Sequence, residues 1–164
     1  MRPHREESGG GLVPDWAGRA ATAHEAYPGF AAAADRLTPT QREAPRAPGE
    51  WSPRAVVAHL VGWDQAFADG LRLVLNGTPE LFQPPTDVDG FNAVSVTARQ
   101  QLSWDELRST LTVTEGDVQS IARLAERAGL PSDSGFGRWL QGQAEDYTHH
   151  AQQLTHYFGA PSLS

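Results

Sequence analysis

Two histidines and a carboxylate are the residues of this sequence best placed to do chemistry together. Asp146 and His150 are four residues apart in a segment that reads as a helix, so both lie on one helical face. His59 lies on the apolar stripe of another predicted helix, one turn before Trp63. Two histidines and one carboxylate on facing helices can form a metal site with coordination positions open for water or substrate. The spacing therefore predicts His59, Asp146 and His150 as candidate metal ligands and catalytic residues.

Further candidates lie near His150 on the same helix. At about 100° per residue, Trp139 and Gln143 each lie about 20° from His150, whereas His149 lies about 100° away on the flank. Gln143 and Trp139 are therefore predicted to contact a substrate. His149 or Tyr147 is expected to move protons as a general acid or base.

A structural role is the alternative for each of these residues. A histidine on an apolar face is commonly a hydrogen-bonded core residue, and an Asp–His pair four residues apart is often only a satisfied pair. Trp51, Trp63, Trp104 and Trp139 are predicted core anchors, although Trp63 and Trp139 are also predicted substrate contacts. Asn92 either caps the helix that follows a long loop, which is the favoured interpretation, or orients a substrate.

The composition excludes several chemistries. The chain has 164 residues and no Cys, and all 13 basic residues are Arg. Without Cys there is no disulfide, no Cys-ligated metal and no cysteine nucleophile, and without Lys there is no Schiff base or P-loop lysine. The net charge of −7 argues against nucleic-acid binding, so we expect a small-molecule substrate as the partner.

Four long helices are predicted to position the candidate residues. Ser52 can cap a helix that begins at Pro53, and Ser103 with Glu106 fits a capping box that restarts a later helix. Pro28 is expected to kink or split the first helix. No alternating strand pattern is visible, which favours an all-α four-helix bundle. The predicted helices cover about residues 15–37, 51–76, 91–128 and 136–158, with a long loop over 77–90 of a length that is often functional.

One domain is expected over residues 14–159. Residues 1–13 are charged and Gly-rich, which predicts a disordered leader, and residues 160–164 form a short tail. No apolar run reaches the length of a membrane span or matches a signal peptide, so we expect no membrane partner and a cytoplasmic protein. The preference for Arg over Lys, with abundant Ala, Gly and Pro, suggests a GC-rich bacterial genome.

Four motifs in order along the chain resemble a known family. The chain is similar to the DinB-like superfamily, which includes mycothiol- and bacillithiol-dependent enzymes and the ClbS/DfsB branch. The resemblance covers about residues 15–158. Its motifs are a Trp-Ser helix start followed by His-Leu-x-x-Trp over 49–63, Asp-Val-Asp-Gly-Phe-Asn over 87–92, Ser-Trp-Asp-Glu-Leu over 103–107, and Asp-Tyr-Thr-His-His-Ala-Gln-Gln-Leu over 146–154.

This resemblance implies an up-down-down-up four-helix bundle and a divalent metal. Three histidines commonly hold the metal in the family, and by position they correspond to His59, Asp146 and His150. Asp146 departs from the pattern, but a carboxylate can still bind Zn²⁺, Ni²⁺, Mn²⁺ or Fe²⁺. The implied activity is a metal-dependent thiol S-transferase or hydrolase that acts on a small electrophile. Because the chain has no Cys, a low-molecular-weight thiol would have to arrive as a cosubstrate.

Two other functions stay open at this point. In a metal-independent detoxification or self-resistance protein, His59 and Asp146 would act as an acid–base pair that binds or opens a reactive molecule in the bundle cavity. A non-catalytic protein would instead sequester a ligand under the 77–90 loop. Bundles of this type also tend to pair through helix faces, so a homodimer is a further expectation.

Overall fold

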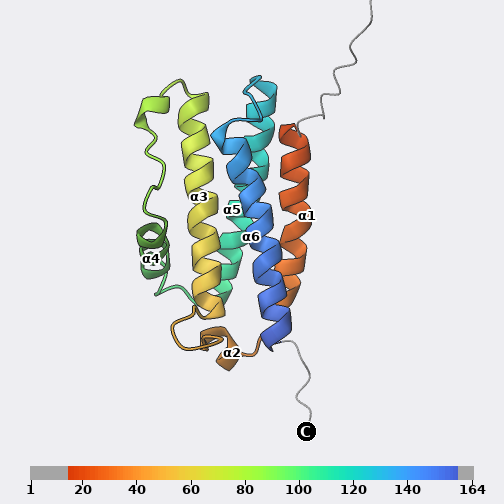
Figure 1. The fold of residues 1–164 in the computed structure, drawn as a ribbon, viewed down its shortest axis with the longest axis vertical. Helices are drawn as coiled ribbons and strands as arrows, with labels where there is room; N and C mark the ends of the chain where they lie inside the picture. The colour runs from red at the N-terminus through yellow and green to blue at the C-terminus, as the bar shows by residue number, and fades with distance from the viewer. Residues whose placement is uncertain (1–14, 159–164) are drawn as a thin grey trace, which may run out of the picture.

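A computed structural model describes residues 15–158, and four long helices form its core. α1 and α6 run in one direction and α3 and α5 in the other, with the segment that contains α4 crossing from α3 to α5 (Figure 1). No strand occurs within the described residues, and the predicted all-α, up-down-down-up bundle is confirmed. The elements are α1 (Trp16–Asp35), α2 (Pro39–Glu43), α3 (Pro53–Leu75), η1 (Pro79–Leu81), α4 (Val88–Ala98), α5 (Trp104–Arg127) and α6 (Gly135–Phe158).

The predicted starts of α3 and α5 are confirmed. Ser52 Oγ accepts the backbone N–H of Ala55 at 3.2 Å, which satisfies one of the free amides at the start of α3. At the start of α5, Ser103 Oγ accepts the N–H of Glu106 at 3.2 Å, and the Glu106 carboxylate accepts the N–H of Ser103 at 2.7 Å. This reciprocal pair is the predicted capping box.

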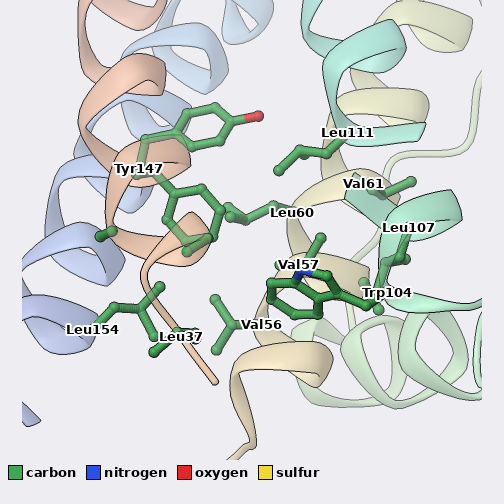
Figure 2. Packing of buried hydrophobic residues seen from close by; sticks show 14 residues of the cluster. Leu37, Val56, Val57, Leu60, Val61, Trp104, Leu107, Leu111, Tyr147 and Leu154 are labelled. Atoms are coloured by element: carbon green, nitrogen blue, oxygen red, sulfur yellow. The ribbon is translucent and has the colours of Figure 1, made fainter. Parts of the chain in front are cut away.

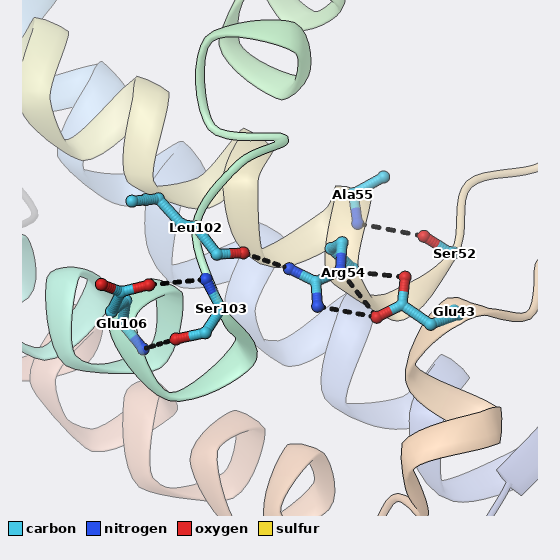
Figure 3. A network of polar contacts seen from close by, with 7 residues as sticks. All are labelled: Glu43, Ser52, Arg54, Ala55, Leu102, Ser103 and Glu106. Atoms are coloured by element: carbon cyan, nitrogen blue, oxygen red, sulfur yellow. Dashed lines mark hydrogen bonds and ion pairs between the residues drawn. The ribbon is translucent and has the colours of Figure 1, made fainter.

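Arg54 ties the starts of these two helices together (Figure 3). Its Nη1 donates to the carbonyl oxygen of Leu102 at 2.7 Å, just before α5. Its Nε donates to the carboxylate of Glu43, at the end of α2, at 2.7 Å. The end of the bundle that holds His59 is therefore fixed by polar contacts as well as by apolar packing.

Two predicted boundaries differ from the structure. α1 continues unbroken through Pro28, because it packs along both α6 and α5 and this packing outweighs one lost backbone hydrogen bond. The region predicted as a loop over 77–90 contains η1 and the start of α4. Asp87 caps α4, since its Oδ1 accepts the N–H of Gly90 at 3.0 Å.

The core consists of two clusters of buried apolar side chains. One surrounds the first half of α3 and includes Trp104, a predicted anchor (Figure 2). Trp63 and Trp139 are only half-buried, and Trp51 is 40% exposed, so the prediction of a core anchor is wrong for Trp51. The second cluster lies towards the other end of the bundle and includes Trp16, Phe67, Leu71, Val118, Ile121 and Leu140.

Two predictions from the sequence concern the ends of the chain, which the structure does not describe. The predicted leader over 1–13 and the predicted tail over 160–164 both lie outside the described residues. Among the helices of residues 15–158, none is long and apolar enough to cross a membrane.

Candidate active site

Asn92 joins α4 to α3 at the centre of the candidate site. It is 7% exposed, and its Oδ1 lies 2.9 Å from His59 Nδ1 and 2.7 Å from Trp63 Nε1. The favoured prediction that Asn92 caps a helix is wrong, because α4 begins at Val88 and Asp87 is its cap. Asn92 instead orients two side chains of α3.

These contacts determine the tautomer of His59. An indole nitrogen can only donate a hydrogen bond, so the atom of Asn92 that contacts Trp63 must be the amide oxygen. The same oxygen contacts His59 Nδ1, which must therefore carry a proton. In neutral His59 the other ring nitrogen, Nε2, then holds a lone pair. Nε2 lies 3.6 Å from Oδ2 of Asp146, so two acceptors face each other.

His150, which lies one turn after Asp146 on α6, is also held through its Nδ1 by an amide oxygen. Its Nδ1 lies 2.8 Å from Gln153 Oε1, and because an amide oxygen only accepts, Nδ1 carries the proton and Nε2 is free. Burial lowers the pKa of His150, which favours the neutral ring. The ring is in edge-to-face contact with His59, with 5.5 Å between centroids. His149 is exposed, and its Nε2 accepts from Gln153 Nε2 at 3.0 Å.

Two hollows border this group. One, of about 290 Å³, is lined by Trp51 and His150, and the Trp51 ring lies 5.1 Å from the His59 ring. The other, of about 320 Å³, borders Asp146 between Trp63 and Trp139. A larger hollow of about 540 Å³ between α1 and α6 is lined by His149 but by none of the three predicted ligands.

Two tryptophans, Trp63 and Trp139, form the aromatic part of the second hollow. The rings of Trp63 and Trp139 are 5.6 Å apart, and Phe91 of α4 lies 4.4 Å from Trp63. Trp139 Nε1 is buried and has no hydrogen-bond partner within the described part of the chain. The hollow therefore offers the aromatic surface of two tryptophans, whereas the buried Trp139 N–H is not accessible from it.

The separation of His59 and Asp146 is close to that of two ligands of one divalent ion. Bonds of about 2.1 Å from a metal to nitrogen or oxygen place two donor atoms about 3.4 Å apart in a tetrahedral site, and the observed separation is 3.6 Å. Both histidines also direct Nδ1–H to an amide oxygen, as metal-binding histidines do. However, no group of three or more His, Cys, Asp or Glu side chains among residues 15–158 is arranged to hold a metal. The pair fits two ligands, and His150 lies beside it without completing the set.

Gln143 and Tyr147 point into the bundle rather than line the exposed part of the site. Gln143 Nε2 donates to Oδ1 of Asp64, and the Tyr147 hydroxyl donates to Oδ2 at 2.6 Å. Burial raises the pKa of Tyr147 well above its ordinary value, and the nearby charge of Asp64 raises it further. Although Gln143 borders the second hollow, its amide is used in the contact with α3.

The close approach of α4 to α3 depends on a glycine. A Cβ added at Gly62 would lie 2.7 Å from Ser95 Cβ, so a larger residue would push α4 outwards. Further along α3, an added Cβ at Gly70 would overlap the ring of Phe82, which anchors the crossover segment. These two positions let α4 bring Asn92 within hydrogen-bonding distance of His59.

Sequence reasoning missed three residues that contribute to this site. Asp64 lies between the apolar residues Val61 and Phe67 of the predicted helix, a signal that could have marked it. Gln153 follows His150 by three residues, which is a spacing for side-chain contact on a helix. Trp51 precedes the cap of α3, and no sequence signal places its ring next to His59.

Comparison with known proteins agrees with this architecture. A family model described as the DinB superfamily matches residues 22–154. No curated protein and no solved structure matches the chain. The matched region includes all of α3, α4 and α5, together with the parts of α6 that carry Asp146 and His150. The chain therefore belongs to the DinB superfamily.

Proposed function

We propose that this protein is an enzyme that acts on a small electrophilic molecule, with His59 and Asp146 as two ligands of a divalent metal and the neighbouring His150 as a third ligand that would approach when the metal binds. The observation that carries this proposal is the 3.6 Å approach of His59 Nε2 to Asp146 Oδ2. Two acceptors 3.6 Å apart repel each other, and a cation that binds near both, either a metal ion or a proton, removes this repulsion. The proposed reaction class is thiol S-transfer or hydrolysis, in keeping with the family resemblance.

Each residue of the group has a distinct task in this proposal. When bound, a metal would polarise a substrate oxygen or lower the pKa of a bound water or thiol. Asn92 keeps His59 Nε2 directed at the site. Burial keeps His150 neutral, so its Nε2 can bind a cation or accept a proton. His149 is exposed and can exchange protons with solvent.

The two hollows suggest where reactants bind. The aromatic wall of Trp63 and Trp139 would hold the apolar body of the electrophile next to Asp146. The hollow between Trp51 and His150 would admit water or a second reactant. For S-transfer this second reactant is a low-molecular-weight thiol, because the chain has no Cys of its own.

Metal binding is the first test of this proposal. Protein purified without added metal and treated with chelator is titrated separately with Zn²⁺, Ni²⁺, Mn²⁺ and Fe²⁺ in a calorimeter. We expect one equivalent of metal per chain, and His59→Ala and Asp146→Ala should each lower the affinity at least about tenfold. His156→Ala, which changes an exposed histidine of the same α6, should leave the affinity unchanged.

Turnover is the second test. The metal-loaded protein is incubated with an epoxide, an aryl halide and an activated ester, with and without a small thiol, and products are followed by mass spectrometry. A thioether product that requires both metal and thiol indicates a transferase, and a hydrolysis product that requires metal alone indicates a hydrolase. A wild-type protein that binds no stoichiometric metal would refute the metal-dependent proposal.

A metal-independent reaction is the second candidate, and the same pair of atoms favours it. If one proton is shared by exchange between Nε2 of His59 and Oδ2 of Asp146, which lie 3.6 Å apart, the two groups act as an acid–base pair able to bind or open a reactive molecule. Full turnover in excess chelator, together with loss of turnover in His59→Ala, supports this reaction. Recovery of unchanged ligand after long incubation supports sequestration without catalysis.

A further inference from the structure

Asp64 is a carboxyl group in the bundle core to which the proposed reaction gives no role. It lies on α3, beyond His59, and is 1% exposed. The hydroxyl of Tyr147 donates to its Oδ2 at 2.6 Å, and Gln143 Nε2 donates to its Oδ1. One carboxyl group therefore holds two side chains of α6 that lie about one helical turn apart. Tyr147 itself packs among the buried apolar residues of the core (Figure 2).

This contact sets how α6 lies against α3. The two helices run in opposite directions, so the part of α6 beyond Tyr147 lies beside the part of α3 before Asp64 (Figure 1). Asp146 follows Gln143 by three residues and His150 follows Tyr147 by three, which places each pair on nearly the same side of α6. The hydrogen bonds of Asp64 therefore restrain both the rotation and the axial position of the site-bearing turns.

We propose that Asp64 is a positioning residue, which through its two hydrogen bonds to α6 sets where Asp146 and His150 lie relative to His59. The proposal rests on the proposed function of those three residues. An apolar side chain would fill the same space without the free-energy cost of burying a carboxyl. Hydrogen bonds are directional, so they can restrain the rotation of a helix more closely than apolar contact does.

The surroundings of Asp64 make its charge sensitive to pH near neutrality. Burial, above all, raises its pKa to about 7, and the negative charge of Glu115 on α5 adds to this effect. Hydrogen bonds from Thr114 of α5 and from the two α6 donors act in the opposite direction. His24 of α1 faces Glu115, with 3.1 Å between Nδ1 and Oε1. Because charged acceptors form stronger hydrogen bonds, the link to α6 is tightest when Asp64 is ionised.

Two substitutions of Asp64 distinguish the effect of its hydrogen bonds on α6 from the effect of its packing in the core. Asp64→Asn keeps the shape and can bond both partners, because its oxygen accepts from Gln143 and its nitrogen can donate to the Tyr147 oxygen. It carries no charge at any pH. Asp64→Leu has a similar branched shape but a larger volume, and it removes both hydrogen bonds. Circular dichroism and urea unfolding show whether each full-length variant folds.

The readout is the nuclear Overhauser effect between the rings of His59 and His150, whose centroids lie 5.5 Å apart. It is recorded on metal-free protein between about pH 5.5 and pH 8.5. In the wild type we expect its intensity to change with a midpoint near 7, the pKa of Asp64. Asp64→Asn should remove this midpoint, and Asp64→Leu should lower the intensity at least about twofold at every pH. Glu115→Gln should shift the midpoint to lower pH, because it removes a charge that raises the pKa of Asp64.

Zn²⁺ titration of the same variants distinguishes failure of this proposal from failure of the proposed function. Asp64→Leu should bind Zn²⁺ at least about tenfold more weakly than the wild type, and Asp64→Asn should recover part of that loss. If the Overhauser effect and the Zn²⁺ affinity are the same in the wild type and both variants, positioning by Asp64 is overturned although metal binds. If the Overhauser effect changes among the variants as expected but neither the wild type nor any variant binds Zn²⁺, the positioning role of Asp64 is supported and the proposed metal-dependent function is refuted. If Asp64→Leu does not fold, a midpoint near pH 7 retained in Asp64→Asn overturns the proposal.

Discussion

His59 Nδ1 lies 2.9 Å from Asn92 Oδ1, and this contact decides which nitrogen of His59 faces the site. The same oxygen accepts from Trp63 Nε1, so the Asn92 amide cannot be reversed without opposing two donors. Asn92 belongs to α4, which lies outside the four-helix core (Figure 1). The crossover between α3 and α5 is therefore part of the candidate site and determines which ring nitrogen of neutral His59 carries the proton.

The role of Asn92 can be tested by substitution. Asn92→Leu leaves two donors, on the buried His59 and the half-buried Trp63, without their acceptor, so the free energy of unfolding should fall by about 1–3 kcal/mol. Metal affinity should fall about 10- to 100-fold, because His59 loses its orienting partner. Urea unfolding and calorimetric titration measure the two effects. Asn92→Asp keeps an acceptor and should retain the affinity, whereas an equal loss in both variants would contradict the orienting role.

Docking of α4 on α3 should be sensitive to one added methyl group. Gly62→Ala would force Ser95 and α4 outwards, and we expect destabilisation by about 1–3 kcal/mol and altered NMR shifts of the His59 ring. Gly116→Ala on α5 is the matched control, because an added Cβ there has nothing within 4 Å. The control should stabilise the protein by about 0.5–1 kcal/mol. Stabilisation by both substitutions would mean that α4 is not held by this close approach.

The buried carboxyl of Asp64 should make stability fall as pH rises. Its pKa is raised from 3.8 to about 7 in the folded protein. Between these values the folded protein keeps a proton that the unfolded chain has released, so stability is fully present below about pH 4 and lost as the pH rises to about 7. The difference in unfolding free energy between wild type and Asp64→Asn should change by up to about 4 kcal/mol across this range.

Urea unfolding at several pH values measures this difference. Asp69→Asn is the matched control, since Asp69 lies on the same helix but its side chain is 74% exposed. Its difference from wild type should vary little with pH. If the difference in unfolding free energy between wild type and Asp64→Asn also varied little with pH, Asp64 would ionise at its ordinary pKa in the folded protein.

Adjacent histidines on α6 should differ in their effect on metal binding. His150 Nε2 is free and its ring contacts that of His59, whereas His149 Nε2 already accepts from Gln153. His150→Ala should therefore lower metal affinity at least about tenfold, and His149→Ala should leave it nearly unchanged. Calorimetric titration of the two variants under one set of conditions provides the comparison. Equal affinities for both variants would remove His150 from the ligand set.

Local sequence signals predicted most of the fold. The starts of α3 and α5 follow from Ser52 and Ser103, whose side chains bond amides within the next turn, and such contacts depend only on nearby residues. The apolar stripe of α3 also predicted which face is buried. Pro28 does not split α1, because the packing of α1 along α6 and α5 outweighs the local rule.

The site was less predictable, because it depends on how helices dock. Helical spacing placed Asp146 and His150 on one face, and the structure brings Asp146 within 3.6 Å of His59. Nothing local indicates that Asn92 reaches His59, since this contact requires the crossover to fold back over Gly62. In the same way, Asp64 and Asp69 lie on one helix, and the positions of α5 and α6 make the first a buried acceptor.

The most direct test of the account is long-range ¹H–¹⁵N NMR of the histidine rings, before and after one equivalent of Zn²⁺. Before addition, His59 should carry its proton on Nδ1 and have an unprotonated Nε2. After addition, the His59 Nε2 resonance should shift in the wild type but not in Asp146→Asn. A proton found on His59 Nε2 in place of Nδ1, or ring resonances that do not respond to Zn²⁺, would contradict the proposed centre.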